Sequence, residues 1–260
     1  MFTSYHLIWL TLCAVIIVIT SVWLKKQKPD LRQVLTVCCV VAVMSELIKV
    51  FSSITLVPSA DGSIMIPYLE MQHLPLHLCS MQILFIFYVR FASDSPRRTT
   101  ILGFMYPTCV AGAFLALFMP SIFANSISPA QAFTHPLAYQ YFLYHSMLII
   151  LGLYIFTSGQ VKLRPKHALS TFLLLAGMAF VSLYVNSMFA APVYANKELL
   201  SVEYTPNMLF TYQPPIPIPI TQLWHWYVYF SVIFLLACVL ITLFYLPILL
   251  KARQERRASV

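Results

Sequence analysis

Charged residues are scarce in this chain: only 9% of its 260 residues are Asp, Glu, Lys or Arg, against about a quarter in a soluble domain. Eight acidic and sixteen basic residues are too few to coat a water-soluble globule of this size. The six glycines leave no room for a phosphate-binding glycine loop or a collagen-like repeat, and the six cysteines lack the CxxC and CxxxC spacings of zinc fingers. In contrast, 60% of the residues are hydrophobic and 15% are aromatic, which predicts a polytopic membrane protein.

Seven apolar stretches are long enough to be transmembrane candidates, since a helix needs about 20 residues to cross a bilayer. They run from His6 to Leu24, Leu31 to Val57, Leu74 to Phe91, Thr99 to Met119, Tyr139 to Thr157, Ala168 to Ala190 and Thr221 to Leu250. The first is too long and too apolar for a signal peptide, and its basic residues follow the apolar run. We therefore expect an all-α bundle of seven transmembrane helices, forming a single membrane domain over residues 1–260 with a short basic tail at 251–260.

The basic residues separate the loops into two sets. Fourteen of the sixteen Lys and Arg residues follow the first, third, fifth or seventh stretch, and the loops between hold acids with a single base, Lys197. By the positive-inside rule, this pattern predicts a cytoplasmic C-terminus and an external N-terminus. The net charge of +8 is thus a topology signal, and we expect no nucleic-acid partner.

Two longer segments, Pro120 to Pro136 and Ala191 to Ile220, are predicted to be external. The first is nearly free of charge, and the second contains six prolines. Because proline fixes φ and removes a donor, the run from Pro214 to Ile220 is predicted to be extended. These segments form either a lid on the outer leaflet or a stiff connector.

Polar residues at bilayer depth are costly and mark function or helix packing. The richest such place is the entry to the third stretch, Glu70 to Gln82. If it is helical, His73 and His77 share a face with Glu70 and Ser80, while Cys79 lies on a neighbouring stripe with Gln72 and Gln82. The start of a helix favours the thiolate form of Cys79. The alternative is a buried structural thiol beside hydrogen-bonded histidines.

Three further polar places follow. His145 lies one turn after Tyr141 in the fifth stretch, and an intramembrane imidazole needs a partner that Tyr141 or another helix can supply. Asn186 lies in the sixth stretch, where amides commonly bond between helices. Trp224, His225, Trp226 and Tyr227 open the last stretch, where aromatic residues also form an interfacial belt.

The predicted topology places Cys79, His77, His145, Asn186 and His225 in the outer half of the bundle. We expect them to converge at one depth. Glu46 and Lys49, three residues apart in the second stretch, are expected to neutralise each other across one helical turn.

These strings resemble a known family. Leu74 to Ser80 reads LPLHLCS and resembles the LPLHLC signature of the bacterial YwaF-type integral membrane proteins and of the eukaryotic transmembrane protein 164 family of lipid acyltransferases. His135 and His145 fall in a pattern similar to FPHxxxxQFFxxH, residues 186–189 resemble NYMF, and residues 224–227 resemble WPWY. Ser187 departs from the aromatic of the third element and His225 from the proline of the fourth, which bears on substrate choice more than on fold.

The resemblance implies a multi-pass acyltransferase that moves a fatty acyl chain between phospholipid and lysophospholipid. Cys79 corresponds to the family's nucleophile. We expect its thiolate to form a thioester with the acyl chain, with His145 as the proton carrier. His77, Asn186 or Tyr141 would stabilise the oxyanion. His77 is the less favoured proton carrier, because on a regular helix it points about 200° away from Cys79.

The remaining candidate residues are expected to line the lipid site rather than to react. The predicted substrate-binding residues are His73, Gln82, His135, Tyr141, Asn186, Trp224, His225, Trp226 and Tyr227.

Other interpretations compete with the acyltransferase. A membrane lipid hydrolase would use the same cysteine and differ only in the acceptor. A metal-dependent hydrolase would need His73 and His77 with Glu70 or Cys79, but no matching constellation occurs in the last stretch. A non-enzymatic transporter or receptor is the third interpretation, although no internal repeat is visible. We expect no cofactor and no metal, and a location in the cell membrane; the sequence does not define the oligomeric state.

Overall fold

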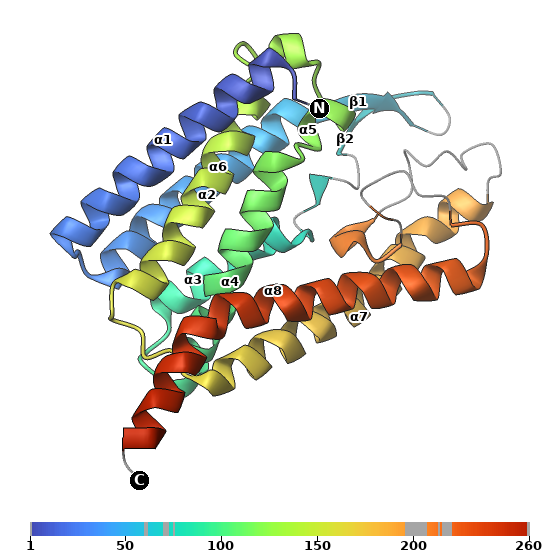
Figure 1. Ribbon diagram of the computed structural model, residues 1–260. Coiled ribbons are helices and arrows are strands. Elements are labelled where there is room, and N and C mark those ends of the chain that lie inside the picture. The colour runs from blue at the N-terminus through green and yellow to red at the C-terminus, as the bar shows by residue number, and fades with distance from the viewer. Residues whose placement is uncertain are drawn as a thin grey trace. The chain divides into compact units, whose positions relative to one another are not determined.

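The computed structural model describes residues 2–59, 62–69, 73–74, 76–195, 207–212, 214 and 220–258, with the backbone alone at 124–125 and 191–195. Seven helices of ten residues or more lie within them (Figure 1). They are α1 Ser4–Gln27, α2 Leu31–Ser53, α3 Leu78–Phe91, α4 Pro96–Phe118, α6 Pro136–Thr157, α7 Pro165–Ala195 and α8 Leu223–Ala258. Shorter elements are α5 Ile122–Asn125, η2 Pro129–Gln131, η5 Met208–Phe210 and the strands β1 Thr55–Pro58 and β2 Met65–Tyr68.

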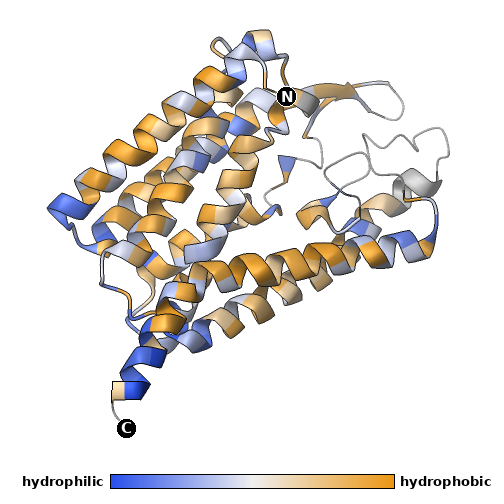
Figure 2. Ribbon diagram, in the orientation of Figure 1, coloured by the Kyte–Doolittle hydropathy of each residue, from blue (hydrophilic) through white to orange (hydrophobic). Residues whose placement is uncertain are grey.

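Among the described residues, six helices are long and apolar enough to cross a membrane: α1, α2, α4, α6, α7 and α8. Figure 2 shows their apolar character along most of their length, with a hydrophilic end on α8. The seventh expected span, α3, has 14 residues, about 21 Å at 1.5 Å per residue, against a hydrocarbon core of about 30 Å. The prediction of an all-α polytopic membrane protein is confirmed, with a third helix shorter than expected.

The third helix begins at Leu78 rather than at Leu74, so the expected helical face shared by His73, His77 and Ser80 is wrong. Both histidines precede the helix, and Glu70 and Gln72 of the same prediction lie outside the described residues. Because a proline disfavours helical geometry in the residue before it, Pro75 accounts for Leu74 lying outside the helix.

The second helix also ends early. It was expected to reach Val57 but stops at Ser53, and β1 pairs antiparallel with β2, with Thr55 opposite Tyr68 and Val57 opposite Ile66. The β-branched residues Ile54, Thr55 and Val57 favour this extended geometry. The prediction that this run is apolar was therefore correct, but the prediction of one continuous helix was wrong.

The chain divides into two compact units. The first unit comprises Met1–His73 and Leu78–Leu163, and the second comprises Leu74–His77 and Arg164–Val260. In the first unit α6 packs against α1, α2 and α4, while α3 packs against α2 and α4. In the second unit α7 and α8 pack side by side and antiparallel.

Helix α6 packs closely against α4 at a glycine. A Cβ at Gly152 would lie 2.6 Å from Val110 Cγ2 and 2.9 Å from the Tyr106 carbonyl oxygen, so the two backbones approach where no side chain intervenes. Small residues at helix interfaces allow this approach in membranes. The consequence is a fixed register between the two helices on which the candidate site is built.

Aromatic packing joins α1 to α6 and to the segment before it. The Trp9 indole lies stacked on Phe142 at 4.7 Å and on Phe133 at 5.4 Å between ring centroids, and its Nε1–H donates to the Ala132 carbonyl at 2.8 Å. Ile122 and Ile127 pack against Leu137. The segment from Pro120 to Pro136 is thus packed on the first unit, whereas most of the proline-rich segment from Ala191 to Ile220 lies outside the described residues.

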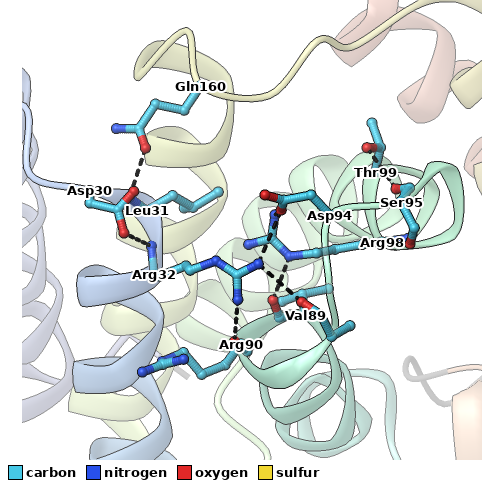
Figure 3. A network of polar contacts seen from close by, with 11 residues as sticks. Asp30, Leu31, Arg32, Val89, Arg90, Asp94, Ser95, Arg98, Thr99 and Gln160 are labelled. Carbon is cyan, nitrogen blue, oxygen red and sulfur yellow. Dashed lines mark hydrogen bonds and ion pairs between the residues drawn. The ribbon is translucent and has the colours of Figure 1, made fainter.

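A polar network ties the loops at one end of the first unit (Figure 3). Arg32 donates to the carbonyls of Arg90 and Ala92, both at 3.1 Å, and pairs with Asp94 at 3.1 Å. Arg98 donates to the Val89 carbonyl at 2.7 Å and pairs with the same carboxylate at 2.8 Å. Two arginines therefore fix the loop between α3 and α4.

Charge pairing inside the second helix is as expected. Lys49 Nζ lies 2.8 Å from Glu46 Oε1, and both side chains are more than half buried. The predicted neutralisation across one helical turn is confirmed.

Candidate active site

Cys79 is the second residue of α3, at the end of the helix where backbone N–H groups lack intrahelical acceptors. Its side chain is half-buried; the described cysteines are otherwise buried apart from Cys238. A Cβ built on Gly112 of α4 would lie 3.6 Å from the Cys79 sulfur. The sulfur thus lies beside the one residue of this part of α4 that carries no side chain.

Tyr144 of α6 anchors the Cys79 backbone. Its hydroxyl donates a hydrogen bond of 2.8 Å to the Cys79 carbonyl oxygen. Tyr141 lies one turn earlier and donates through its hydroxyl to the Ala116 carbonyl of α4, also at 2.8 Å.

A buried amide lies one helical turn beyond Cys79. Gln82 is fully buried, its Nε2 donates to Thr108 Oγ1 at 3.0 Å, and its Oε1 accepts from the Cys109 thiol at 3.3 Å. The Thr108 hydroxyl in turn donates to the Phe104 carbonyl at 2.7 Å. Since each polar group here has a partner, Gln82 locks α3 onto α4 rather than presenting a free amide to a ligand.

The hydrogen bond of His145 identifies its tautomer. Nδ1 lies 2.6 Å from the Tyr141 carbonyl oxygen, which only accepts, so Nδ1 carries the proton and Nε2 holds the basic lone pair of the neutral ring. The ring packs against Tyr141 at 4.4 Å and Tyr144 at 5.7 Å between centroids. Tyr141 therefore supplies the expected partner, through its backbone rather than its hydroxyl.

Within the described part of the chain, neither His145 nitrogen hydrogen-bonds the Cys79 sulfur. The two side chains belong to neighbouring positions of the first unit, linked by Tyr144, which touches the His145 ring and holds the Cys79 carbonyl. The expected direct sulfur–imidazole contact is thus absent here, and the tyrosine between them was not among the predicted site residues.

His135 lies at the start of α6 and stabilises it. It is the N-cap of α6, where its Nδ1 accepts from the Leu137 N–H at 3.3 Å. Such a cap satisfies one of the unpaired donors at the start of a helix. His135 therefore stabilises the start of α6, and its expected contact with lipid stays a prediction.

In the second unit Asn186 holds a short segment against α7. Its Oδ1 accepts from the Met208 N–H at 2.9 Å, and its Nδ2 donates to the Met208 carbonyl at 3.1 Å and to Thr211 Oγ1 at 2.9 Å. Leu209 and Phe210 between them have positive φ, 56° and 53°. The amide is used to fix a turn with unusual backbone geometry, and its partners lie in that turn rather than in another helix.

The aromatic cluster at the start of α8 holds the same turn. Trp226 Nε1 donates to the Thr211 carbonyl at 2.9 Å, and the Tyr229 hydroxyl donates to the Phe210 carbonyl. Trp224 and Tyr227 are each 58% exposed, as befits an interfacial belt. His225 lies against the Trp224 ring and 3.2 Å from Thr221 Oγ1 through Nδ1.

The structure thus gathers Cys79, Gln82, Tyr141 and His145 in the first unit, and His77, Asn186 and residues 224–227 in the second. The His77 ring contacts Phe210, with centroids 6.3 Å apart. Convergence of the two groups at one depth stays a prediction. Sequence reasoning missed Tyr144 and Gly112; the YFLYH string from Tyr141 to His145 and the scarcity of glycine were the available signals.

In the part of the chain that the structure describes, no three His, Cys, Asp or Glu residues lie close enough to hold a metal ion. Glu70, one of the residues of the metal interpretation, lies outside it.

Comparison with known proteins decides the family. The family model described as TMEM164 family matches residues 1–245, nearly the whole chain. The chain belongs to the TMEM164 family. No curated protein and no solved structure matches it. Family membership agrees with the multi-pass helical architecture and with the LPLHLCS string at the start of α3.

Proposed function

We propose that this TMEM164-family chain is a membrane lipid acyltransferase that moves a fatty acyl chain from a phospholipid to a lysophospholipid through a thioester on Cys79. The observation that carries the proposal is the setting of Cys79. It is a half-buried thiol at a helix start, facing the bare backbone of Gly112, with its carbonyl held by Tyr144. At this position the sulfur lies beside a residue that has no side chain to block the approach of an ester group.

In the first half-reaction the Cys79 thiol gives its proton to His145 Nε2, and the sulfur attacks the ester carbonyl carbon of the donor phospholipid. The carbon–sulfur bond forms as the carbon–oxygen bond breaks, and the departing lysolipid oxygen takes the proton from His145. In the second half-reaction the acceptor hydroxyl attacks the thioester while His145 takes its proton. The sulfur leaves as thiolate and regains that proton.

Direct proton transfer needs a hydrogen bond between His145 and the Cys79 sulfur, which the described residues do not form. Catalytic hydrogen bonds often tighten only when substrate is bound, and one bridging water is sufficient. The tautomer supports the role, because the Tyr141 carbonyl keeps the proton on Nδ1 and leaves Nε2 basic. Tyr141 thereby orients the base, as the third member of a nucleophile–base arrangement does.

The oxyanion needs donors that are not already used. Asn186 and the Tyr141 hydroxyl are committed to backbone and hydroxyl partners. The first-turn N–H groups of α3 are better placed, since they belong to the same turn as the sulfur and lack intrahelical acceptors. We assign the oxyanion to the backbone N–H groups at Cys79 and Ser80.

The direct test is acyl exchange between a labelled phosphatidylcholine and an unlabelled lysophospholipid by purified protein. Cys79→Ala is expected to abolish the exchange while the melting temperature stays within a few degrees. Cys238→Ala is the matched control, because Cys238 is the other half-buried thiol, and it is expected to exchange at the wild-type rate. Full exchange by Cys79→Ala contradicts the proposal. Release of free fatty acid in place of exchange would assign a hydrolase.

A further inference from the structure

An open groove lies on the first unit between the second half of α3 and the first turns of α4, with a volume of about 620 Å³. That volume is in the range of small-molecule sites. Its walls are almost entirely apolar, and their principal residues are Leu84, Phe85, Tyr88, Pro96, Arg97 and Ile101. Leu84 is 67% exposed, so the groove opens outward from helices that are themselves apolar.

Arg97 is the cation in this wall, and it differs from its neighbours. Arg98 and Arg32 are both paired with Asp94 and bonded to backbone carbonyls (Figure 3). Arg97 is exposed and makes no hydrogen bond or ion pair within the described residues. The Asp94 carboxylate is therefore paired with Arg32 and Arg98, whereas the Arg97 guanidinium lines the apolar groove.

The groove is separate from the candidate active site. Cys79 is the second residue of α3, whereas Leu84 and Tyr88 follow it by five and nine residues, about 8–14 Å along the helix axis. On α4, Arg97 precedes Gly112, the neighbour of Cys79, by fifteen residues, or about 22 Å. A ligand in the groove would touch the opposite end of the α3–α4 pair.

We propose that this groove binds one anionic glycerophospholipid of the surrounding membrane, with its phosphate on Arg97 and an acyl chain along Leu84, Phe85 and Ile101. A guanidinium matches phosphate oxygens with a pair of parallel hydrogen bonds, and it attracts a net-negative headgroup more strongly than a zwitterionic one. The apolar wall fits a hydrocarbon chain. The site does not depend on the acyl-transfer proposal.

The test is native mass spectrometry of the purified full chain in detergent with equimolar dioleoylphosphatidylglycerol and dioleoylphosphatidylcholine. The wild type is expected to retain phosphatidylglycerol preferentially. Arg97→Gln is expected to lower that preference about tenfold, the effect of losing a hydrogen bond to a charged group. Arg97→Lys, which keeps the charge without the forked donors, is expected to fall between them.

Two controls make the result specific. Lys26→Gln removes an exposed charge from the last turn of α1 and is expected to leave the preference unchanged. Leu84→Trp fills the groove and is expected to reduce retention of phosphatidylglycerol and to remove its preference over phosphatidylcholine. The proposal is overturned if wild type shows no preference, if Arg97→Gln keeps it, or if Lys26→Gln lowers it as much.

Discussion

At the scale of single residues, the account depends on which nitrogen of His145 is basic. The Tyr141 carbonyl fixes the proton on Nδ1, which leaves Nε2 to exchange protons with Cys79 or with the lipid hydroxyl. Tyr144 then acts on the other partner, because it holds the backbone of Cys79 rather than its sulfur. The two tyrosines position the reacting groups without reacting themselves.

His145→Gln removes the base and keeps a side chain able to donate. We expect the rate of acyl exchange to fall about 100- to 10,000-fold, the range of general acid–base catalysis. His135→Gln is the control, since His135 caps α6, and we expect it to change the melting temperature more than the rate. Equal rates for the wild type and His145→Gln would remove this histidine from the mechanism.

Tyr144→Phe deletes one hydroxyl and keeps the ring that contacts His145. The lost hydrogen bond to the Cys79 carbonyl is expected to slow single-turnover acylation up to about tenfold, corresponding to roughly 1 kcal/mol, with little change in the lipid concentration needed for half-maximal rate. Single-turnover kinetics with excess enzyme measures this. Tyr184→Phe, at an exposed tyrosine of α7, serves as the comparison. A change confined to lipid affinity would contradict a positioning role.

At the scale of elements, the candidate site depends on α4, which packs on α3 through Gln82 and on α6 through Gly152. The sequence predicted helices in these three places but not their contacts. Glycine spacing along one chain does not reveal which neighbour a helix approaches. Which helix each of these helices contacts is seen only in the three-dimensional structure.

Gly152→Ala tests the α4–α6 approach. Its Cβ would lie within 3.0 Å of two atoms of α4, so the helices must separate. We expect a loss of about 1–3 kcal/mol of stability from overpacking. Gly177→Ala is the matched control, because its Cβ meets nothing within 4 Å, and we expect it to be neutral or slightly stabilising. Thermal unfolding in detergent compares them; equal stabilities would show that the close approach is absent.

At the scale of the whole molecule, the apolar composition and the run lengths sufficed to predict a polytopic helical membrane protein, and the resemblance of the LPLHLCS string predicted the family. Two features were not predictable from the lengths of the apolar runs alone. The stretch ending at Val57 divides into a helix and a strand, because hydropathy does not distinguish β-branched strand residues from helical ones. The stretch beginning at Leu74 becomes helical only at Leu78, and Pro75 accounts for the exclusion of Leu74 from the helix.

The roles assigned to the site residues stay predictions. Sequence patterns selected Cys79, Tyr141 and His145, whose chemistry is visible in the residue types. In the structure His135 caps a helix and Gln82 bonds α3 to α4, and the expected contact of these two residues with lipid stays a prediction. A polar residue can stabilise packing or take part in chemistry, and its hydrogen-bond partners distinguish these two roles.

The short α3 makes membrane topology a sharp test. We propose an external N-terminus and a cytoplasmic C-terminus, which requires α3 to cross despite its 14 residues. Single cysteines at Ser63 in the hairpin, Ser93 between α3 and α4, and Gln254 in the tail are expected to react with an impermeant maleimide from outside, inside and inside, respectively. External labelling at Ser93 would show that α3 does not cross.

The most direct test of the central claim is to look for acyl-Cys79 itself. Wild-type protein is incubated briefly with a diacyl phospholipid, without a lysophospholipid acceptor. The protein is then digested, and its peptides are analysed by mass spectrometry. We predict one acyl chain on the peptide containing Cys79, removed by neutral hydroxylamine and by added lysophospholipid, and absent from His145→Gln at the same time point. Acyl exchange that proceeds at full rate without such an adduct, or with the acyl chain on another cysteine, would contradict the account.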